Sequence, residues 1–409
     1  MKPEGELVRL PPAAALAAAG RGAAGAAAAG GAARPRLFAH LPGLRQRLPW
    51  IALAEGVPSP VEPLAALGRY WGLPQLYVKR DDRTSLLYGG NKVRKLEWLL
   101  AQARARGHRS VLTFGAWGSH HALATAIFAG RLGLGCYLVL CPQPLTAHVA
   151  TNLQAALGAG ARLVAVPHLA WMPLGAVWAR WRAWRDGQGL PFAIPPGGSS
   201  PVGALGYVEC GLEIAAQVAA GEAPAPDYLY VAAGTCGTLA GLAYGLALGA
   251  AQAPALARTQ VVGVRVVPRP VTSVAAVRRL LRRLGALLRD AGAGQLPAPC
   301  PVEVFGGALG RGYGQPTPQG REAAELARQL HGLVLDPTYT AKCMAGLRAF
   351  ATAPERRQAV HLYVHTLSGA SLLPWLERGA ALARFLPSPV RALAAEATGR
   401  RRGAGATGR

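Results

Sequence analysis

Residues 228–248 read YLYVAAGTCGTLAGLAYGLAL, and this stretch decides the fold class. The apolar run Tyr228–Ala232 predicts a buried strand, and the apolar run Leu239–Leu248 predicts a helix. Between them, the residues Gly234–Thr238 form a short turn rich in glycine and threonine. A strand that passes through a short turn into a helix is the repeating unit of α/β proteins.

The same alternation recurs on both sides of this stretch. Further strands are predicted at Ser110–Phe114, Tyr137–Leu140, Arg162–Val166, Val261–Val267 and Val360–Val364. Further helices are predicted at Val93–Arg106, His120–Leu132, Val149–Leu157, Leu205–Ala219, Gln319–Leu330 and Ala341–Ala351. Because the strands are continuously apolar, we expect parallel sheets with helices on both faces. An amphipathic, arginine-bearing helix over Val274–Ala291 is expected at the surface, as an insertion.

The composition indicates a folded chain with a large excess of positive charge. Of the 409 residues, 51% are hydrophobic, and 44 Lys and Arg face 20 Asp and Glu, which gives a formal charge of +24. The arginines form no stripe interleaved with aromatic residues, so we expect no nucleic-acid partner. Binding of nucleic acid or an anionic surface through arginine-rich ends stays open as an alternative.

The two ends and the cysteines limit the location. Residues 1–36 predict a low-complexity lead, and residues 386–409 predict a helical remnant followed by a flexible basic tail. The Ala- and Gly-rich stretch 13–33 lacks the Leu, Ile and Val density of a membrane span, so we expect no membrane partner. The six cysteines are dispersed, which predicts no metal site and favours a cytoplasmic location.

Residues 89–97, GGNKVRKLE, place a lysine at the start of a helix. The positive end of the helix dipole disfavours an ammonium group, so we expect the pKa of Lys92 to be lowered. A neutral amine is what a Schiff base with an aldehyde requires. Taken alone, a Gly-Gly turn before a basic helix is more often ordinary structure.

The turn made by Gly234, Thr235, Cys236, Gly237 and Thr238 predicts an anion site. Glycines let the backbone approach an anion, and the N–H groups and dipole of the following helix favour negative charge. The pattern is neither a Walker loop nor the dinucleotide glycine spacing, and it suits a phosphate monoester. A tight strand–helix turn is an equal alternative when this turn is considered alone.

Three further segments combine turn residues with reactive groups. Residues 115–121, GAWGSHH, follow a strand at the edge where open α/β sheets bind ligands, and Ser119 is the natural N-cap of the next helix. Gly312-Tyr313-Gly314 and residues 335–342, LDPTYTAK, each place a tyrosine among turn residues. His365-Thr366 follows the last predicted strand.

Together these motifs resemble the D-cysteine desulfhydrase and 1-aminocyclopropane-1-carboxylate deaminase family of tryptophan-synthase-β-like enzymes. The resemblance covers about Pro60 to Pro374 and is carried, in order, by GGNKVRKLEW, GAWGSHH, PPGGSSPVGALGYVE, AAGTCGTLAG, GYGQPT, LDPTYTAKCMAGL and LYVHT. It implies pyridoxal 5'-phosphate as the cofactor, a small amino acid as the substrate, and a homodimer. It also implies a large domain (37–94 plus 204–385) and a small domain (95–203), with the cofactor in the cleft between them.

The resemblance also implies roles for single residues. Lys92 would bind the cofactor and move substrate protons, Ser119 and Tyr313 would face the substrate, and Tyr339 would stack on the pyridine ring. The remaining cofactor contacts would be Asn91, Lys95, His120, Gly234, Thr235, Cys236, Gly237, Thr238, Thr340 and Thr366. A hydroxyl near the pyridine nitrogen, where the deaminase branch has Glu after the tyrosine, favours desulfhydrase-like β-elimination that yields ammonia, a 2-oxo acid and sulfide.

Departures from the family pattern leave the substrate open. The family's usual Asn after Ser119 is His120, its usual Gln before Ser119 is Gly118, and its usual Gly-Gly after Thr366 is Leu367-Ser368. These changes line the expected substrate side, so the substrate need be neither D-cysteine nor the cyclopropane amino acid. Ring opening as in the deaminases, and a cofactor-binding protein with altered or lost turnover, remain alternatives.

Overall fold

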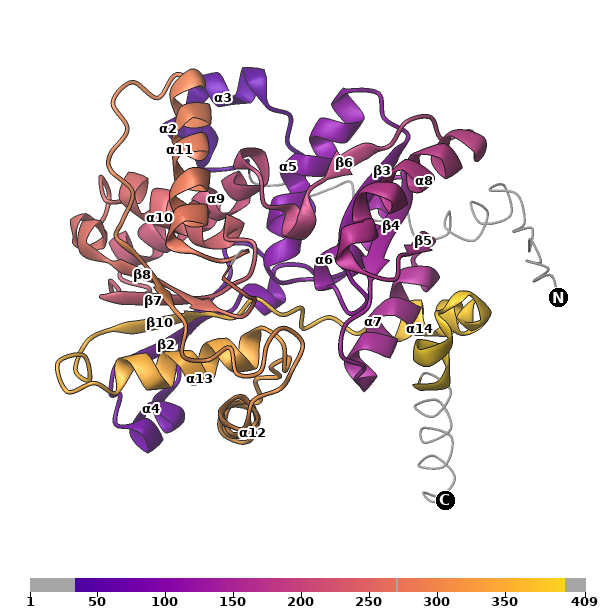
Figure 1. Ribbon diagram of the computed structural model, residues 1–409. Coiled ribbons are helices and arrows are strands. Elements are labelled where there is room, and N and C mark those ends of the chain that lie inside the picture. The colour runs from indigo at the N-terminus through magenta and orange to yellow at the C-terminus, as the bar shows by residue number, and fades with distance from the viewer. Residues whose placement is uncertain (1–33, 270, 394–409) are drawn as a thin grey trace. The chain divides into compact units, whose positions relative to one another are not determined.

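The computed structural model describes residues 34–269 and 271–393, which build two β-sheets covered by helices (Figure 1). The larger sheet has the strand order β1-β2-β10-β7-β8-β9. Its strands are β1 (Val61–Pro63), β2 (Leu76–Lys79), β7 (Tyr228–Ala233), β8 (Gln260–Arg265), β9 (Val302–Phe305) and β10 (His361–Val364). All pairs are parallel except β1 with β2. Because β10 lies between β2 and β7, the last strand of the chain reaches the centre of this sheet.

Helices cover both faces of the larger sheet, as its continuously apolar strands require. On one face lie α4 (Ala65–Trp71), α12 (Pro318–His331) and α13 (Thr340–Ala351). On the other lie α9 (Pro201–Ala219), α10 (Gly237–Gly249) and α11 (Val274–Asp290). The short helices α2 (Leu37–His40) and α3 (Pro42–Arg47) pack beside α9 and α11.

The smaller sheet has four parallel strands in the order β5-β4-β3-β6. These are β3 (Ser110–Ala116), β4 (Gly135–Cys141), β5 (Ala161–Ala165) and β6 (Phe192–Ile194). One face packs against α8 (Met172–Arg185), and the other packs against α5 (Asn91–Ala105), α6 (His120–Arg131) and α7 (Ala147–Gly158). Single 3-10 turns occur at Asp81–Arg83, Leu169–Trp171, Pro196–Gly198, Pro254–Arg258 and Ala383–Phe385.

The predicted α/β class with two open parallel sheets is confirmed, and the elements that the sequence missed have physical reasons. Strands β1, β2, β6 and β9 have three or four residues and show only a weak periodicity, although β10 is equally short and was predicted. Helix α8 was missed because its buried face holds Gly175, Ala176, Ala179 and Ala183, whereas Trp178 and Trp181 are exposed. Its apolar pattern therefore points away from the core.

Two predictions about placement need correction. The helix predicted over Val274–Ala291 is not merely a surface insertion, because α11 buries Leu284 and Leu288 completely against its neighbours. Helix α14 (Leu373–Ala380), predicted within the large domain, packs on α7 beneath the smaller sheet, and the Gln154 side chain donates to the Leu376 carbonyl at 3.0 Å. The predicted lead falls almost wholly outside the described residues, as does the basic tail beyond residue 393. Among the described residues, no helix is both long and apolar enough to cross a bilayer.

Candidate functional site

Lys92 lies in the first turn of α5, two residues after a glycine that a left-handed backbone and a tight backbone approach both require. Gly90 has φ of 82°, and a Cβ there would lie 2.4 Å from the carbonyl oxygen of Thr366. The Asn91 amide donates to that same oxygen at 3.2 Å, so the segment after β10 holds the start of α5. Lys92 is half-buried, and burial lowers its pKa to about 8, although nearby Asp336 opposes the shift.

Lys95 lies almost one turn further along α5 and is buried. Burial and the charge of Lys92 hold the pKa of Lys95 well below its ordinary value. Its Nζ donates to the Gly197 carbonyl at 3.2 Å and lies 3.5 Å from Ser199 Oγ. A buried amine whose partners are all neutral is stabilised strongly by an added anion.

The loop Gly234–Thr238 faces these groups at the start of α10. Ser199 Oγ accepts from the Gly237 amide at 3.2 Å and lies 2.6 Å from Thr235 Oγ1. A Cβ at Gly237 would lie 2.5 Å from Ser199 Oγ and 3.0 Å from Lys95 Nζ. The absence of a side chain at this position thus keeps open a polar cradle, which fits a phosphate group.

Two features shape this loop further. Cys236 has φ of 65° and is the single non-glycine residue with a positive φ in the described chain. A left-handed residue beside the right-handed helical residues of α10 turns successive backbone N–H groups towards one concavity, as in backbone anion nests. Asn91 Nδ2 donates to Thr238 Oγ1 at 3.1 Å, which joins the start of α5 to the start of α10. Ser199 lies within the motif PPGGSSPVGALGYVE, but the sequence did not predict it as a site residue. Its partners Lys95 and Thr235 lie far away along the chain.

Asp336 is a buried carboxylate that sequence reasoning missed as a site residue. It accepts from the backbone amides of Thr338, Tyr339 and Thr340 at 2.9, 2.7 and 3.0 Å, and from Thr340 Oγ1 at 2.7 Å. Burial raises the pKa of Asp336. His120, His148 and the hydrogen bonds from Thr340 lower it by more, so the net shift is downward. The Thr340 hydroxyl is thus engaged at the start of α13, and its predicted place near a pyridine nitrogen stays a prediction.

Two tyrosines meet above this carboxylate. Tyr313 Oη and Tyr339 Oη lie 2.7 Å apart, with ring centroids 5.9 Å apart in an edge-on arrangement. Burial raises the pKa of Tyr313 to about 12, and the pKa of Tyr339 is raised further by burial and by its partner. Both phenols are therefore neutral near pH 7, and because one donates to the other, one phenol proton remains available to a further partner.

His120 belongs to a cluster with two residues that the sequence did not indicate. Tyr88 Oη lies 2.7 Å from His120 Nδ1, and His148 Nε2 lies 2.9 Å from His120 Nε2. Burial, followed by the charge of His148, lowers the pKa of His120 to about 3. The His120 ring also lies edge-on to Tyr339 at 6.1 Å between centroids.

Ser119 adopts the N-cap role that its position predicted, accepting from the Ala122 amide at 3.2 Å. The space beside the neighbouring Gly118 is filled by Gln143, two residues after the end of β4. The Gly118 amide donates to Gln143 Oε1 at 3.1 Å, and a Cβ at Gly118 would lie 2.9 Å from Gln143 Nε2. Ser119 and Gln143 thus stand at the carboxyl ends of neighbouring parallel strands, where α/β sheets bind ligands.

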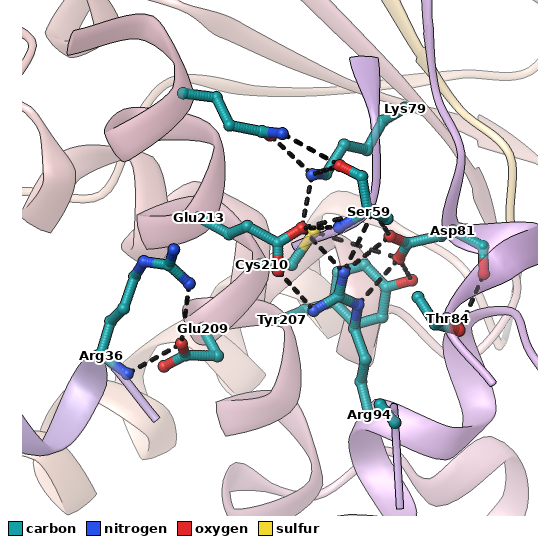
Figure 2. A network of polar contacts seen from close by, with 12 residues as sticks. Arg36, Ser59, Lys79, Asp81, Thr84, Arg94, Tyr207, Glu209, Cys210 and Glu213 are labelled. Carbon is teal, nitrogen blue, oxygen red and sulfur yellow. Dashed lines mark hydrogen bonds and ion pairs between the residues drawn. The ribbon is translucent and has the colours of Figure 1, made fainter. Parts of the chain in front are cut away.

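A buried ionic network fixes the opposite side of α5 (Figure 2). Arg94 donates to Asp81 at 2.8 Å and to Glu213 at 3.0 Å, and Tyr207 donates to Asp81 at 2.6 Å. Lys79 pairs with Glu213 as well. Strand β2, helix α5 and helix α9 are thereby tied together at Arg94, two residues after Lys92 and one before Lys95.

The predicted site residues fall into two neighbouring groups joined by Lys92. The first faces the anion cradle and comprises Asn91, Lys95, Gly234, Thr235, Cys236, Gly237 and Thr238. The second surrounds Asp336 and comprises His120, Tyr313, Tyr339 and Thr340, with Ser119 adjacent in the chain. Thr366 contacts the start of α5 through its backbone. The roles of these residues remain predictions.

Comparison with known proteins gives consistent relatives. Residues 53–366 match the model of the family described as pyridoxal-phosphate dependent enzyme. D-cysteine desulfhydrase of Serratia proteamaculans (strain 568) is 34% identical over 329 residues, which cover 78% of this chain and 94% of that protein. D-cysteine desulfhydrase of Salmonella choleraesuis (strain SC-B67) is 36% identical over 300 residues, covering 71% and 85%. The crystal structure of an ACC deaminase homologue superposes with a TM-score of 0.68 at 28% identity, covering 86% of this chain and all of that one.

Proposed function

The chain belongs to the family of pyridoxal-phosphate dependent enzymes, and from this premise we propose that it catalyses an elimination on a small amino acid, with release of ammonia and a 2-oxo acid. The observation that carries the proposal is the pair of amines on α5. Lys92 has a pKa lowered to about 8, and one turn away Lys95 faces a polar cradle that a Cβ at Gly237 would fill.

The residues at the cradle fit the cofactor's phosphate. Lys95 would supply the charge, and the Gly237 amide and the hydroxyls of Ser199 and Thr235 would supply hydrogen bonds. Lys92 would hold the cofactor's aldehyde through its uncharged amine. When bound, pyridoxal phosphate withdraws electrons from the bonds at the α-carbon of an amino acid.

The chain's own groups would then move protons and orient the substrate. Lys92, with about one tenth of its amines uncharged at pH 7 for a pKa of about 8, is a base suited to neutral pH. The Tyr313–Tyr339 pair keeps two phenols neutral, so one of them can donate a proton towards a leaving group. Ser119 lies at an N-terminal turn whose dipole favours a substrate carboxylate.

The relatives support a D-cysteine-like substrate with sulfide as the leaving group. Two of them carry the name D-cysteine desulfhydrase at 34% and 36% identity. Thr340, rather than a carboxylate, follows Tyr339, which favours a milder electron sink and simple β-elimination. Ring opening of 1-aminocyclopropane-1-carboxylate is the second candidate, because the superposed crystal structure is titled an ACC deaminase homologue.

Turnover by the purified, cofactor-loaded protein tests the proposal. We expect 2-oxo acid and sulfide from D-cysteine, measured against L-cysteine, D-serine and the cyclopropane amino acid. Lys92→Ala should abolish both the turnover and the covalent cofactor absorbance, whereas Arg104→Ala, at the far end of α5, should change neither. A 2-oxo acid from none of the four compounds would refute the elimination.

Three broader features are proposed on family resemblance. We propose a homodimer, a cytoplasmic location, and a division into a large domain (37–94 plus 204–385) and a small domain (95–203), with the cofactor held between them. The two separate sheets support the division, except at α14. Light scattering of the purified enzyme tests the dimer, since a monomeric mass at micromolar concentration would contradict it.

A further inference from the structure

We propose that Tyr88, His120 and His148 form a relay that carries protons from the Lys92 site to solvent, with His148 as its outer member. The inference rests on the proposed function for its purpose, but its geometry is independent of any substrate. Tyr88 is buried at 2% exposure, whereas His148, on the first turn of α7, is only half-buried. The chain of contacts therefore runs from the interior towards the surface.

The hydrogen bonds of Asn152 assign one direction to this chain. Asn152 Nδ2 donates to the Gly118 carbonyl at 3.0 Å and lies 3.2 Å from His148 Nε2 and 3.5 Å from His120 Nδ1, two nitrogens that an amide N–H can approach only as a donor. An Nε2 that accepts a hydrogen bond carries no proton, so the proton of neutral His148 resides on Nδ1. The single lone pair of His148 Nε2 is then shared between the Asn152 amide and, at the shorter distance of 2.9 Å, His120 Nε2–H, and His120 Nδ1 accepts from the phenol of Tyr88.

Every donor in the chain consequently points outward. A proton that reaches the Tyr88 oxygen from the site releases the phenol proton to His120 Nδ1. His120 then passes its Nε2 proton to His148 Nε2, and His148 releases its Nδ1 proton to water. One proton enters and one leaves, and no bond between heavy atoms changes. Reverse transfer or rotation of the rings restores the first state.

The surroundings keep the relay neutral between transfers. Three further titratable groups lie near His120. They are Lys92 on α5, Tyr339 at the start of α13, and Asp336 in the loop that leads into α13. Burial and the charge of Lys92 favour a neutral imidazole at His120, and Asp336 stabilises a passing positive charge. A neutral chain with a nearby carboxylate suits transient proton transfer better than permanent charge storage.

An exchange reaction tests the relay without requiring elimination. D-alanine has no leaving group on its β-carbon, so the loaded enzyme in D₂O should exchange only its α-proton, followed by ¹H NMR. We expect His148→Gln to slow the exchange about tenfold or more, because Gln keeps a hydrogen bond to His120 but takes up no proton. His148→Ala should be slow as well and should recover in imidazole buffer. The control His168→Gln alters an exposed histidine and should exchange at the wild-type rate.

A second measurement uses the cofactor-free protein. ¹⁵N NMR of the histidine rings should show His120 protonated at Nε2 and His148 at Nδ1, and His148→Gln should leave the His120 tautomer unchanged. The opposite tautomers, or equal exchange rates in wild type and His148→Gln, would overturn the relay. Normal exchange by an enzyme that releases no 2-oxo acid would refute the proposed elimination and leave the relay intact.

Discussion

Helix α5 presents two sets of cations to two different environments, and the contrast between them explains the site. Arg94 lies between Lys92 and Lys95 in the chain, yet it faces Asp81 and Glu213, which offset its burial and raise its pKa well above the ordinary value. Neither lysine forms an ion pair among the described residues, and burial lowers both of their pKa values, although Asp336 partly opposes the shift at Lys92. Charge pairing makes one side rigid, and its absence makes the other side reactive.

The difference shows that a buried cation acquires its role from its partners. The Arg94 network leaves each charge compensated, so it fixes the position of α5 against β2 and α9. Burial of the charged lysines costs free energy that no ion pair offsets, and binding of a phosphate and an aldehyde would lower that cost. The same helix can thus anchor a cofactor firmly because its other side is already held in place.

Removing the anchor should have the largest effect. Arg94→Met leaves Asp81 and Glu213 buried with less compensation, so we expect the free energy of unfolding to fall by about 3–5 kcal/mol. Chemical denaturation measures this loss. The matched control Arg131→Met breaks an exposed pair with Glu55 and should cost at most about 1 kcal/mol. Equal losses in the two variants would contradict the contrast between the two sides of α5.

The same network makes the stability of the folded chain depend on pH under acid conditions. Burial alone would raise the pKa of Glu213, but Arg94 and Lys79 lower it to about 2, below its unfolded value of 4.5. The carboxylate therefore contributes stability above about pH 4.5, and this contribution is lost as the pH falls towards 2. In Arg94→Met the pH dependence over this window should flatten.

Filling the cradle should have the next largest effect. Gly237→Ala puts a methyl group 2.5 Å from Ser199 Oγ, so the affinity for pyridoxal 5'-phosphate should fall about 10- to 100-fold, or about 1.4–2.7 kcal/mol. Fluorescence titration of the cofactor-free protein measures it. Gly294→Ala is the control, because a Cβ there meets open space. Unchanged affinity in Gly237→Ala would place the phosphate elsewhere.

The smallest expected effect is the pH dependence of the reaction between Lys92 and the cofactor. Because the folded pKa of Lys92 is about 8 rather than 10.5, its free-amine fraction rises from about one tenth at pH 7 to about nine tenths at pH 9. The rate of covalent cofactor uptake by the cofactor-free protein should therefore rise about tenfold over this range and then level. A rate that keeps climbing above pH 10, as for an ordinary lysine, would show that burial does not tune the amine.

Sequence patterns predicted the central elements because each one buries a run that periodicity can detect. Strands β3, β4, β5, β7, β8 and β10 and helices α5, α6, α7, α9 and α10 lie within a few residues of their predicted bounds. The strands that were missed are the short edge strands β1, β6 and β9 and the short inner strand β2, and α8 was missed because its tryptophans face outward. The pairing of β10 between β2 and β7 is a tertiary arrangement that local pattern does not encode.

At the candidate site, sequence reasoning selected residues that lie within recognisable turns. Lys92 and the Gly234–Thr238 loop are of this kind, and the structure supports their selection without testing their roles. Tyr88, His148 and Asp336 were not selected, because their meaning comes from contacts across the fold rather than from their neighbours in the chain. The residues beside it in the chain predict the backbone conformation of a residue more readily than they predict which side chains it contacts.

The contact between Gly118 and Gln143 limits which residues can be exchanged at this edge of the smaller sheet. The two positions are 25 residues apart, yet the amide of one strand end occupies the volume that the bare backbone of its neighbour leaves free. Transplanting the glutamine typical of the resembling family into position 118 alone would force two amide groups into one space. A larger side chain at position 118 therefore requires a smaller one at position 143 at the same time, so that evolution and engineering face a coupled step here.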